Sequence, residues 1–182
     1  MGIYLVRHGE AAARWHESDD PGLSERGRAQ AAATARDLAR RLDPDIRLCS
    51  SPMLRARETA APLAAALGAE VTLVGSFTEI PTPVAQADRQ TWLTEIARQT
   101  WAEQVALVRN WRGSLLAQLR RIEEPTVIFT HFMVINAIVG AVKSDDRVVC
   151  CLPDTASVTV LRGYGEGLEL AELGRQLRSR VN

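Results

Sequence analysis

The feature that most constrains this chain is a short apolar run at residues 3–6, which ends on Arg7, His8 and Gly9. Four consecutive apolar residues are typical of a strand that is buried on both faces in the mainly parallel sheet of an α/β protein. Such sheets bind ligands just beyond the carboxyl ends of their strands. We therefore predict a central strand that places Arg7 and His8 at a binding or catalytic site.

An arginine in a later helix is predicted to lie near the end of a second strand. Residues 46–49 predict that strand, and a helix is expected over 51–67, with Ser51 as its cap and Pro52 at its first position. Arg55 then falls in the first turn of this helix. A guanidinium at this place can bind two oxygens of an anion at once, so lysine would be a poor substitute.

A third apolar run ends on a histidine. Residues 126–130 predict a buried strand, and His131 follows it directly. A histidine at this position can be a purely structural group with a satisfied ring. Its place at a strand end opposite Arg7 and His8 favours a role in the site.

The rest of the chain alternates helical and extended patterns that suit one α/β domain. Asp88, Trp92 and Glu95 belong to a helical piece that we expect to cover the site, and an apolar stripe from Trp101 to Ile122 indicates a core-facing helix. A polar tail is expected to fray from Arg175 onward. The further expected elements are a loop at 11–22, a helix at 25–42, strands at 71–74, 158–161 and 168–173, a proline-bearing loop at 76–83, a helix from 132 and a hairpin loop at 163–167.

Several segments, in chain order, match one known family. They are Leu5-Val6-Arg7-His8-Gly9-Glu10, Leu23-Ser24-Glu25-Arg26-Gly27-Arg28-Ala29-Gln30-Ala31, Ser51-Pro52 through Arg55 and Thr59-Ala60, Glu79, and Thr130-His131. Together they resemble the histidine phosphatase superfamily, also called the phosphoglycerate mutase-like family, whose signature is Arg-His-Gly after the first strand. The resemblance implies an α/β fold: a three-layer sandwich with a mainly parallel central sheet flanked by helices.

The resemblance also implies roles for five residues. His8 is expected to be the nucleophile that forms a phosphohistidine, and Glu79 the acid that protonates the leaving group. Arg7, Arg55 and His131 are expected to bind the phosphoryl group. Within the region after Glu79, the other acidic candidates for the proton donor are Asp88 and Glu95.

The chain departs from the family pattern in two places. The Gly-x-Trp-Glu-Gly-like segment that commonly follows the acidic residue is missing after Glu79, and Phe132 stands where the family most often has glycine. Phe132 is expected to narrow the pocket. The residues 11–13 are all alanine and the insertion at 78–87 is mostly uncharged, which argues against a phosphoglycerate mutase, because related mutases carry hydroxyl, amide and basic residues there.

Composition limits the compartment and the partners. The 182 residues, of which 46% are hydrophobic, suit a single domain over residues 1–182. Lysine and arginine balance aspartate and glutamate at 22 each, so we expect neither a nucleic acid nor a membrane as partner. The start of the chain resembles no signal peptide. With three cysteines and no Cys-x-x-Cys spacing, we expect reduced thiols in the cytoplasm, and no metal or cofactor.

The sequence thus predicts a metal-independent phosphomonoesterase that acts on a small phosphorylated metabolite or a phosphoprotein. The alternatives are a phosphoglycerate mutase-type phosphotransferase and a noncatalytic module that binds a phosphorylated ligand. Trp15 is a candidate for a pocket wall, while Arg14 and His16 are left out of the catalytic set. The physiological substrate and the oligomeric state do not follow from the sequence.

Overall fold

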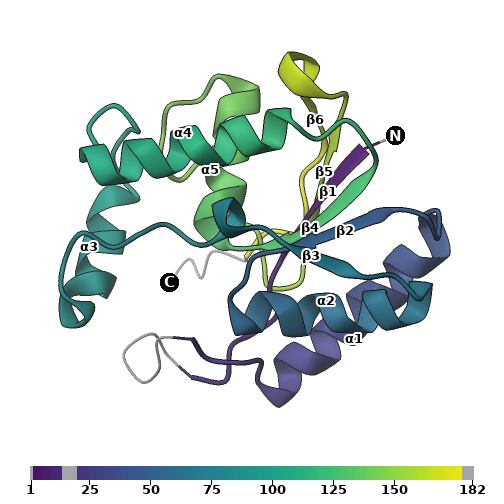
Figure 1. Ribbon diagram of the computed structural model, residues 1–182. Helices are drawn as coiled ribbons and strands as arrows, with labels where there is room; N and C mark the ends of the chain where they lie inside the picture. Colours follow the sequence, from purple (N-terminus) through teal and green to yellow (C-terminus); the bar gives the residue numbers. More distant parts are fainter. Residues whose placement is uncertain (1, 14–19, 178–182) are drawn as a thin grey trace.

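One sheet of six strands organises the part of the chain that the computed structural model describes, residues 2–13 and 20–177 (Figure 1). The strand order is β3-β2-β4-β1-β5-β6. β1 to β4 are parallel to one another, whereas β5 runs antiparallel to β1 and β6 antiparallel to β5. The strands are β1 (Gly2–Arg7), β2 (Arg47–Ser50), β3 (Val71–Leu73), β4 (Thr126–Thr130), β5 (Val158–Arg162) and β6 (Glu169–Glu172).

Helices cover both faces of this sheet, which confirms the predicted three-layer α/β sandwich. On one face, α1 (Glu25–Arg41) and α2 (Leu54–Leu67) pack together, and on the other lie α4 (Ala106–Arg120) and α5 (Phe132–Lys143) (Figure 1). The short helix α3 (Arg89–Ile96) lies to the side of the sheet. Three single turns, η1 (Gly75–Phe77), η2 (Gln86–Asp88) and η3 (Gly165–Gly167), occur in the connections.

Strand β1 contributes to both hydrophobic clusters of the core because its side chains alternate between the two faces. Leu5 packs in the cluster with α4 and α5, while Val6 packs in the cluster with α1 and α2. Both side chains are completely buried. The apolar run at the start of the chain is therefore a central strand, as predicted, and its carboxyl end lies between its neighbours β4 and β5.

The start of α2 differs from its prediction. The helix begins at Leu54, after Pro52, and its N-cap residue Met53 makes no side-chain capping bond. The backbone N–H of Leu54 instead donates to the carboxylate of Asp20, at 2.8 and 3.1 Å. Ser51 was wrongly predicted as the cap, since it lies two residues before the N-cap Met53. Its hydroxyl accepts from the backbone N–H of Met53 at 3.3 Å and also bonds to a side chain of the neighbouring strand end, described below. Gly68 ends the helix at φ 63°, a left-handed conformation that glycine adopts at little cost.

The helical stripe from residue 88 to 122 is interrupted between α3 and α4. The backbone N–H of Trp101 donates to the carbonyl of Asp146, and Val148 donates to the carbonyl of Gln99. These bonds tie residues 99–101 to the segment after α5, and turns and bends take the place of a helix over residues 97–104. Trp101 is still core-facing, as predicted, with 1% of its surface exposed.

Two further expectations concern the C-terminal tail and the loop after β1. Residues 175–177 are held by backbone bonds, from Asp154 to Arg175 and from Leu177 to Leu152, so the expectation of fraying is wrong for them. Residues 178–182 lie outside the described part of the chain, as do Arg14, Trp15 and His16.

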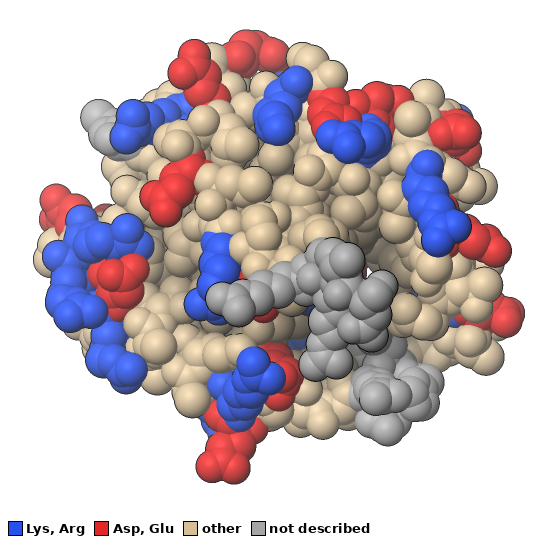
Figure 2. Space-filling view, turned by 180° about the vertical axis from the view of Figure 1, so that it is seen from behind, with Lys and Arg blue, Asp and Glu red and all other residues tan. Residues whose placement is uncertain are grey.

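The surface carries charges of both signs. On the face seen from behind, blue and red side chains are interspersed (Figure 2). Among the helices of the described residues, none is long and apolar enough to cross a membrane.

Candidate active site

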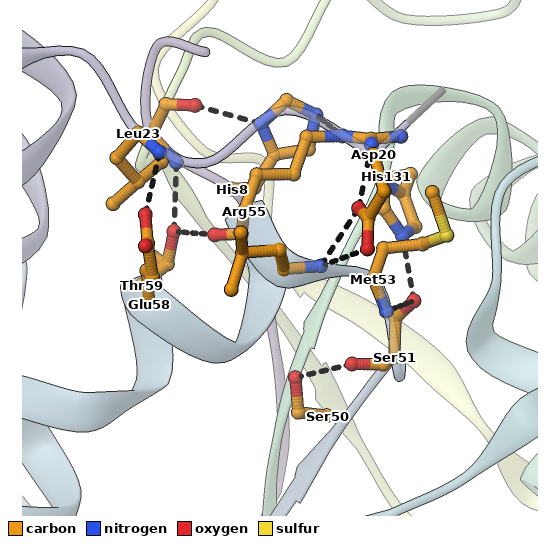
Figure 3. A network of polar contacts seen from close by, with 12 residues as sticks. His8, Asp20, Leu23, Ser50, Ser51, Met53, Arg55, Glu58, Thr59 and His131 are labelled. Carbon is orange, nitrogen blue, oxygen red and sulfur yellow. Dashed lines mark hydrogen bonds and ion pairs between the residues drawn. The ribbon is translucent and has the colours of Figure 1, made fainter. Parts of the chain in front are cut away.

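His8 directly follows β1 and is 5% exposed (Figure 3). Its Nδ1 lies 2.7 Å from the carbonyl oxygen of Gly9, which can only accept, so Nδ1 carries the proton. The other ring nitrogen, Nε2, then has a lone pair, which accepts a 3.2 Å bond from Nε of Arg55. The backbone thus fixes one tautomer and one orientation of the ring.

The environment of His8 strongly favours its neutral form. Burial, followed by the positive charges of Arg55 and Arg7, lowers the pKa of His8 from 6.5 to about 3. The bond to the Gly9 carbonyl acts in the opposite direction but is outweighed. At neutral pH the ring is therefore uncharged, and its Nε2 is available as a nucleophile.

Arg55 lies in the first turn of α2 and is 1% exposed. Its Nη1 lies 3.8 Å from the carboxylate of Asp20, so the guanidinium extends between that carboxylate and His8 (Figure 3). Thr59, one turn later, accepts from the N–H of Gly9 at 3.0 Å and donates to the carbonyl of Arg55 at 2.7 Å. This hydroxyl joins the end of β1 to α2 and thereby sets the position of the arginine relative to the histidine.

Arg7 is held on the other side of the site. Its Nη1 donates to the carbonyl of Pro153 at 2.8 Å, and its guanidinium carbon lies 5.2 Å from the centre of the Phe132 ring. The π face of the Phe132 ring therefore stabilises the positive charge of Arg7. Burial lowers the pKa of Arg7, while the negative charges of Glu79 and Asp154 act to raise it.

His131 is completely buried at the start of α5. Its ring centre lies 5.2 Å from that of His8, edge to face, and its Nε2 lies 2.8 Å from the hydroxyl of Ser51. Burial is the main cause that places its pKa well below 6.5, with the positive charges of neighbouring groups acting in the same direction. Within the described residues, Nδ1 of His131 has no hydrogen-bond partner.

Glu79 lies in the loop after η1, with its carboxylate at the N-terminus of α5. The carboxylate accepts from the backbone N–H of Ile80 at 3.0 Å and of Met133 at 3.2 Å. Burial raises the pKa of Glu79 above 4.5, although the Ile80 bond and nearby arginines act to lower it. The alternative acids Asp88 and Glu95 are both exposed, and of the three acids Glu79 is the one that lines a pocket together with Arg55.

One residue that the sequence did not single out lies beside this acid. Arg89, the first residue of α3, lines a pocket of about 180 Å³ together with Arg55, Glu79 and Met53. Its Nη1 donates to the hydroxyl of Thr82, and its charge is among those that lower the pKa of Glu79. The insertion at 78–87 is mostly uncharged, but the residue two positions beyond it brings a third guanidinium to the site.

A family model covers almost the whole chain. The model of the histidine phosphatase superfamily (branch 1) matches residues 3–176. The chain belongs to the histidine phosphatase superfamily. No curated protein sequence matches it. The resemblance seen in the sequence is thus confirmed for almost the whole length of this histidine phosphatase superfamily member.

Solved structures of low sequence identity share its fold. A mycobacterial glucosyl-3-phosphoglycerate phosphatase superposes with a TM-score of 0.70 at 22% identity, covering 96% of this chain and 99% of the other. A phosphoglycerate mutase from Thermus thermophilus superposes with a TM-score of 0.66 at 21% identity, covering 98% of this chain and all of the other. These likenesses confirm the phosphoglycerate mutase-like fold.

The structure brings together the five residues expected at the site. Arg7 and His8 come from the end of β1, Arg55 from α2, His131 from the end of β4 and Glu79 from the loop after η1. The contacts that sequence reasoning missed are those of Asp20, Ser51, Thr59 and Arg89. Of these, Ser51 and Thr59 belong to the matched segments, but no local pattern indicates their bonds to His131 and Gly9.

Proposed function

We propose that this superfamily member is a metal-independent phosphomonoesterase that works through a phosphohistidine at His8. The observation that carries the proposal is the state of that ring, which is neutral, fixed by the Gly9 carbonyl through Nδ1 and facing Arg55 with Nε2. A neutral imidazole in this orientation is a nucleophile toward phosphorus. The guanidinium beside it can bind the oxygens of the group under attack.

The first half-reaction transfers the phosphoryl group to His8. As the phosphate arrives, Arg55 exchanges its bond to Nε2 for bonds to the phosphate oxygens, which uncovers the lone pair. Arg7 and His131 bind the remaining oxygens, so charge that builds up in the transition state meets donors that are already in place. Nε2 then forms a bond to phosphorus as the bond to the leaving alkoxide breaks.

Glu79 is the proposed proton donor for that alkoxide. A carboxyl whose pKa is raised by burial holds its proton at a higher pH than an exposed one, as a general acid requires. In the second half-reaction, the ionised carboxylate takes a proton from water as the water attacks phosphorus, and His8 leaves. The bonds from Ile80 and Met133 keep the carboxylate in place through both steps.

The substrate class that we propose is a small phosphorylated metabolite or a phosphoprotein. The pocket beside Glu79 is where the leaving group would lie, because the acid that protonates the leaving group lines it. Arg89 lines the same pocket, so a leaving group with a second negative charge would gain an ion pair there.

Trapping the phosphoenzyme tests the proposal. Labelled substrate, mixed with the protein and quenched in alkali, should leave a base-stable, acid-labile label on the peptide that contains His8. His8→Ala should lose both the label and phosphate release. His16→Ala is the matched control, because it removes the histidine that has no role in the proposed reaction, and it should retain the label. An intact label in His8→Ala, or steady phosphate release without any adduct, contradicts the proposal.

A further inference from the structure

Two adjacent cysteines, Cys150 and Cys151, lie in the segment that connects α5 to β5 and play no part in the proposed reaction. Cys150 is partly exposed, whereas Cys151 is 7% exposed. The two residues are consecutive in the chain. An outer thiol that a reagent can reach is therefore adjacent to an inner one that is shielded.

Asn136 holds both cysteines in this arrangement. It is a completely buried amide in helix α5, in which the only other polar side chain is that of Lys143 in the last turn. Its side-chain oxygen accepts from the backbone N–H of Cys150 at 2.8 Å and of Cys151 at 2.9 Å. Each sulfur also lies near an oxygen of Asn136, at 3.6 Å for Cys150 and 3.5 Å for Cys151. A buried polar residue is costly unless it is bonded in this way, so its bonds specify the conformation of the pair.

We propose that Cys150 and Cys151 form a peroxide-reactive dithiol, in which Cys150 attacks the peroxide and Cys151 closes a vicinal disulfide. The assignment of the two roles follows from exposure, because a hydroperoxide must reach the outer sulfur first. The inner sulfur belongs to the next residue in the chain, so no other chain segment has to move for it to react.

The acidities of the thiols support the same division. The neighbouring side chain of Cys151 is the main cause that lowers the pKa of Cys150 to about 7, with Lys143 acting in the same direction and burial and Asp145 against it. The pKa of Cys151 is raised, first by the side chain of Cys150 and then by burial. Burial also raises the pKa of Cys49, the third cysteine. Cys150 is thus the thiol that forms a thiolate at neutral pH, and the thiolate is the reactive species.

A hydroperoxide is the oxidant that converts the two thiols to a disulfide. The Cys150 thiolate attacks the outer peroxide oxygen, the O–O bond breaks, and the alkoxide leaves as an alcohol after taking a proton. The resulting sulfenic acid is attacked by the sulfur of Cys151, the S–O bond breaks, and the leaving hydroxide combines with the thiol proton as water. Two thiols are oxidised to one disulfide, and one peroxide is reduced.

The product is expected to be strained and easily reduced. Adjacent Cα atoms are about 3.8 Å apart across a trans peptide, whereas disulfides usually join Cα atoms about 4.4–6.8 Å apart. The peptide between Cys150 and Cys151 must therefore twist, and the bonds to Asn136 must loosen. Strained disulfides have higher reduction potentials than structural ones, which suits a reversible modification.

The segment also reaches the proposed active site. Pro153, two residues after Cys151, supplies the carbonyl that anchors Arg7 at 2.8 Å. A twist at the cysteines should move this carbonyl and release Arg7 from its position. This consequence alone rests on the proposed function, since the oxidation itself does not require phosphatase activity.

Peptide mapping tests the oxidation directly. The folded protein is treated with hydrogen peroxide, unfolded, alkylated with iodoacetamide and digested with trypsin, which releases both cysteines in one peptide, residues 148–162. We expect this peptide without alkylation and lighter by two hydrogen atoms, and we expect dithiothreitol to reverse the change. Cys49, in a separate peptide, should be alkylated in full.

Two variants separate the roles of the sulfurs. Cys151→Ala should stop at a sulfenic acid on Cys150, which dimedone captures, while Cys150→Ala should leave Cys151 reduced over the same time. The lowered pKa of Cys150 raises its thiolate fraction at neutral pH but lowers the nucleophilicity of that thiolate. Together the two effects should make the oxidation of Cys150 about fivefold faster in the folded protein than in the protein unfolded in urea. Equal rates in the two states, faster oxidation of Cys49, or a wild-type protein that keeps a sulfenic acid without a disulfide overturns the proposal.

Activity measurements address the link to Arg7 separately. The oxidised wild type should lose roughly tenfold or more in kcat/KM, within the ~10²-fold that a misplacement of about 1 Å can cause. Cys150→Ser should be active and insensitive to peroxide. A disulfide that forms without any loss of activity overturns the link to Arg7 but leaves the oxidation intact. A reduced protein without phosphatase activity overturns the proposed function and leaves the mapping result standing.

Discussion

Acid should destabilise this protein through His8, and the size of the effect follows from its surroundings. Burial and two neighbouring arginines lower the pKa of His8 to about 3, whereas in the unfolded chain it is about 6.5. Between pH 3 and pH 6.5, His8 is therefore protonated in the unfolded state and neutral in the folded state. The contribution of His8 to stability is largest above pH 6.5 and is lost as the pH falls toward 3.

At about 1.36 kcal/mol for each pH unit, the full penalty is about 5 kcal/mol, of which roughly 3 kcal/mol has developed at pH 4. We therefore expect His8→Asn to lose roughly 3 kcal/mol less stability than the wild type when the pH falls from 7 to 4. The comparison uses the difference between the two proteins, because carboxylates such as Glu79 titrate in both.

Urea unfolding at pH 8, 7, 5.5 and 4, followed by circular dichroism, measures this difference. Between pH 8 and 7 the difference in free energy of unfolding between the two proteins should stay constant, which serves as the internal control. His131→Asn should resemble His8→Asn in direction, since the pKa of His131 is also lowered by burial. An offset that stays constant down to pH 4 would show that His8 is solvated or already protonated, and it would refute the neutral nucleophile.

Three further predictions concern single residues or the whole site. Glu79→Gln should slow phosphoenzyme formation from an alkyl phosphate by about 10²–10⁴-fold in single-turnover rates and from p-nitrophenyl phosphate much less, whereas equal losses would argue against the acid. Arg89→Gln should raise KM for a substrate whose leaving group carries a carboxylate, and a similar rise for an uncharged leaving group would contradict the ion pair. Phosphate release should be unchanged in EDTA, because no group of three or more His, Cys, Asp or Glu in residues 2–13 and 20–177 is arranged to hold a metal ion; loss of activity that a divalent ion restores would refute this.

The residues at strand ends were predictable because local patterns determine where strands end. A buried run of four or five apolar residues identifies a strand, and in a parallel sheet the residue after it lies at the ligand-binding edge. His8 and His131 each directly follow the strand that such a run predicts, so their positions could be predicted without a structure. Arg55 was predictable for a related reason, since its helix starts a few residues after such a run.

The contacts of the loops were not predictable in the same way. Arg89 reaches the site because residues 74–89 pass beside it, held in part by a 3.0 Å bond from the indole N–H of Trp111 to the carbonyl of Thr78. No periodic pattern encodes that path. Ser51 has the composition of a helix cap, and only the tertiary position of His131 gives its hydroxyl a different partner.

Gly27 gives another example of a tertiary cause. In a helix interior, glycine is unfavourable by about 1 kcal/mol relative to alanine, and the sequence offers no reason for it. In the structure, a Cβ at Gly27 would collide with the backbone carbonyl of Glu10, two residues after His8. The close approach of α1 to the end of β1 therefore requires a residue without a Cβ atom at position 27.

The central position of β1 has a consequence for the synthesis of the chain. Ile3 pairs with Thr126 on one side and with Leu161 on the other, so its nearest sheet partner lies roughly 120 residues later. At about 5–20 residues per second, the ribosome needs about 6–24 s to make that interval. During this time the apolar strand that carries the proposed nucleophile has no native neighbour in the sheet. Ribosome-bound chains that stop before β4 should therefore bind chaperones through residues 3–6, and chains that extend beyond β5 should release them.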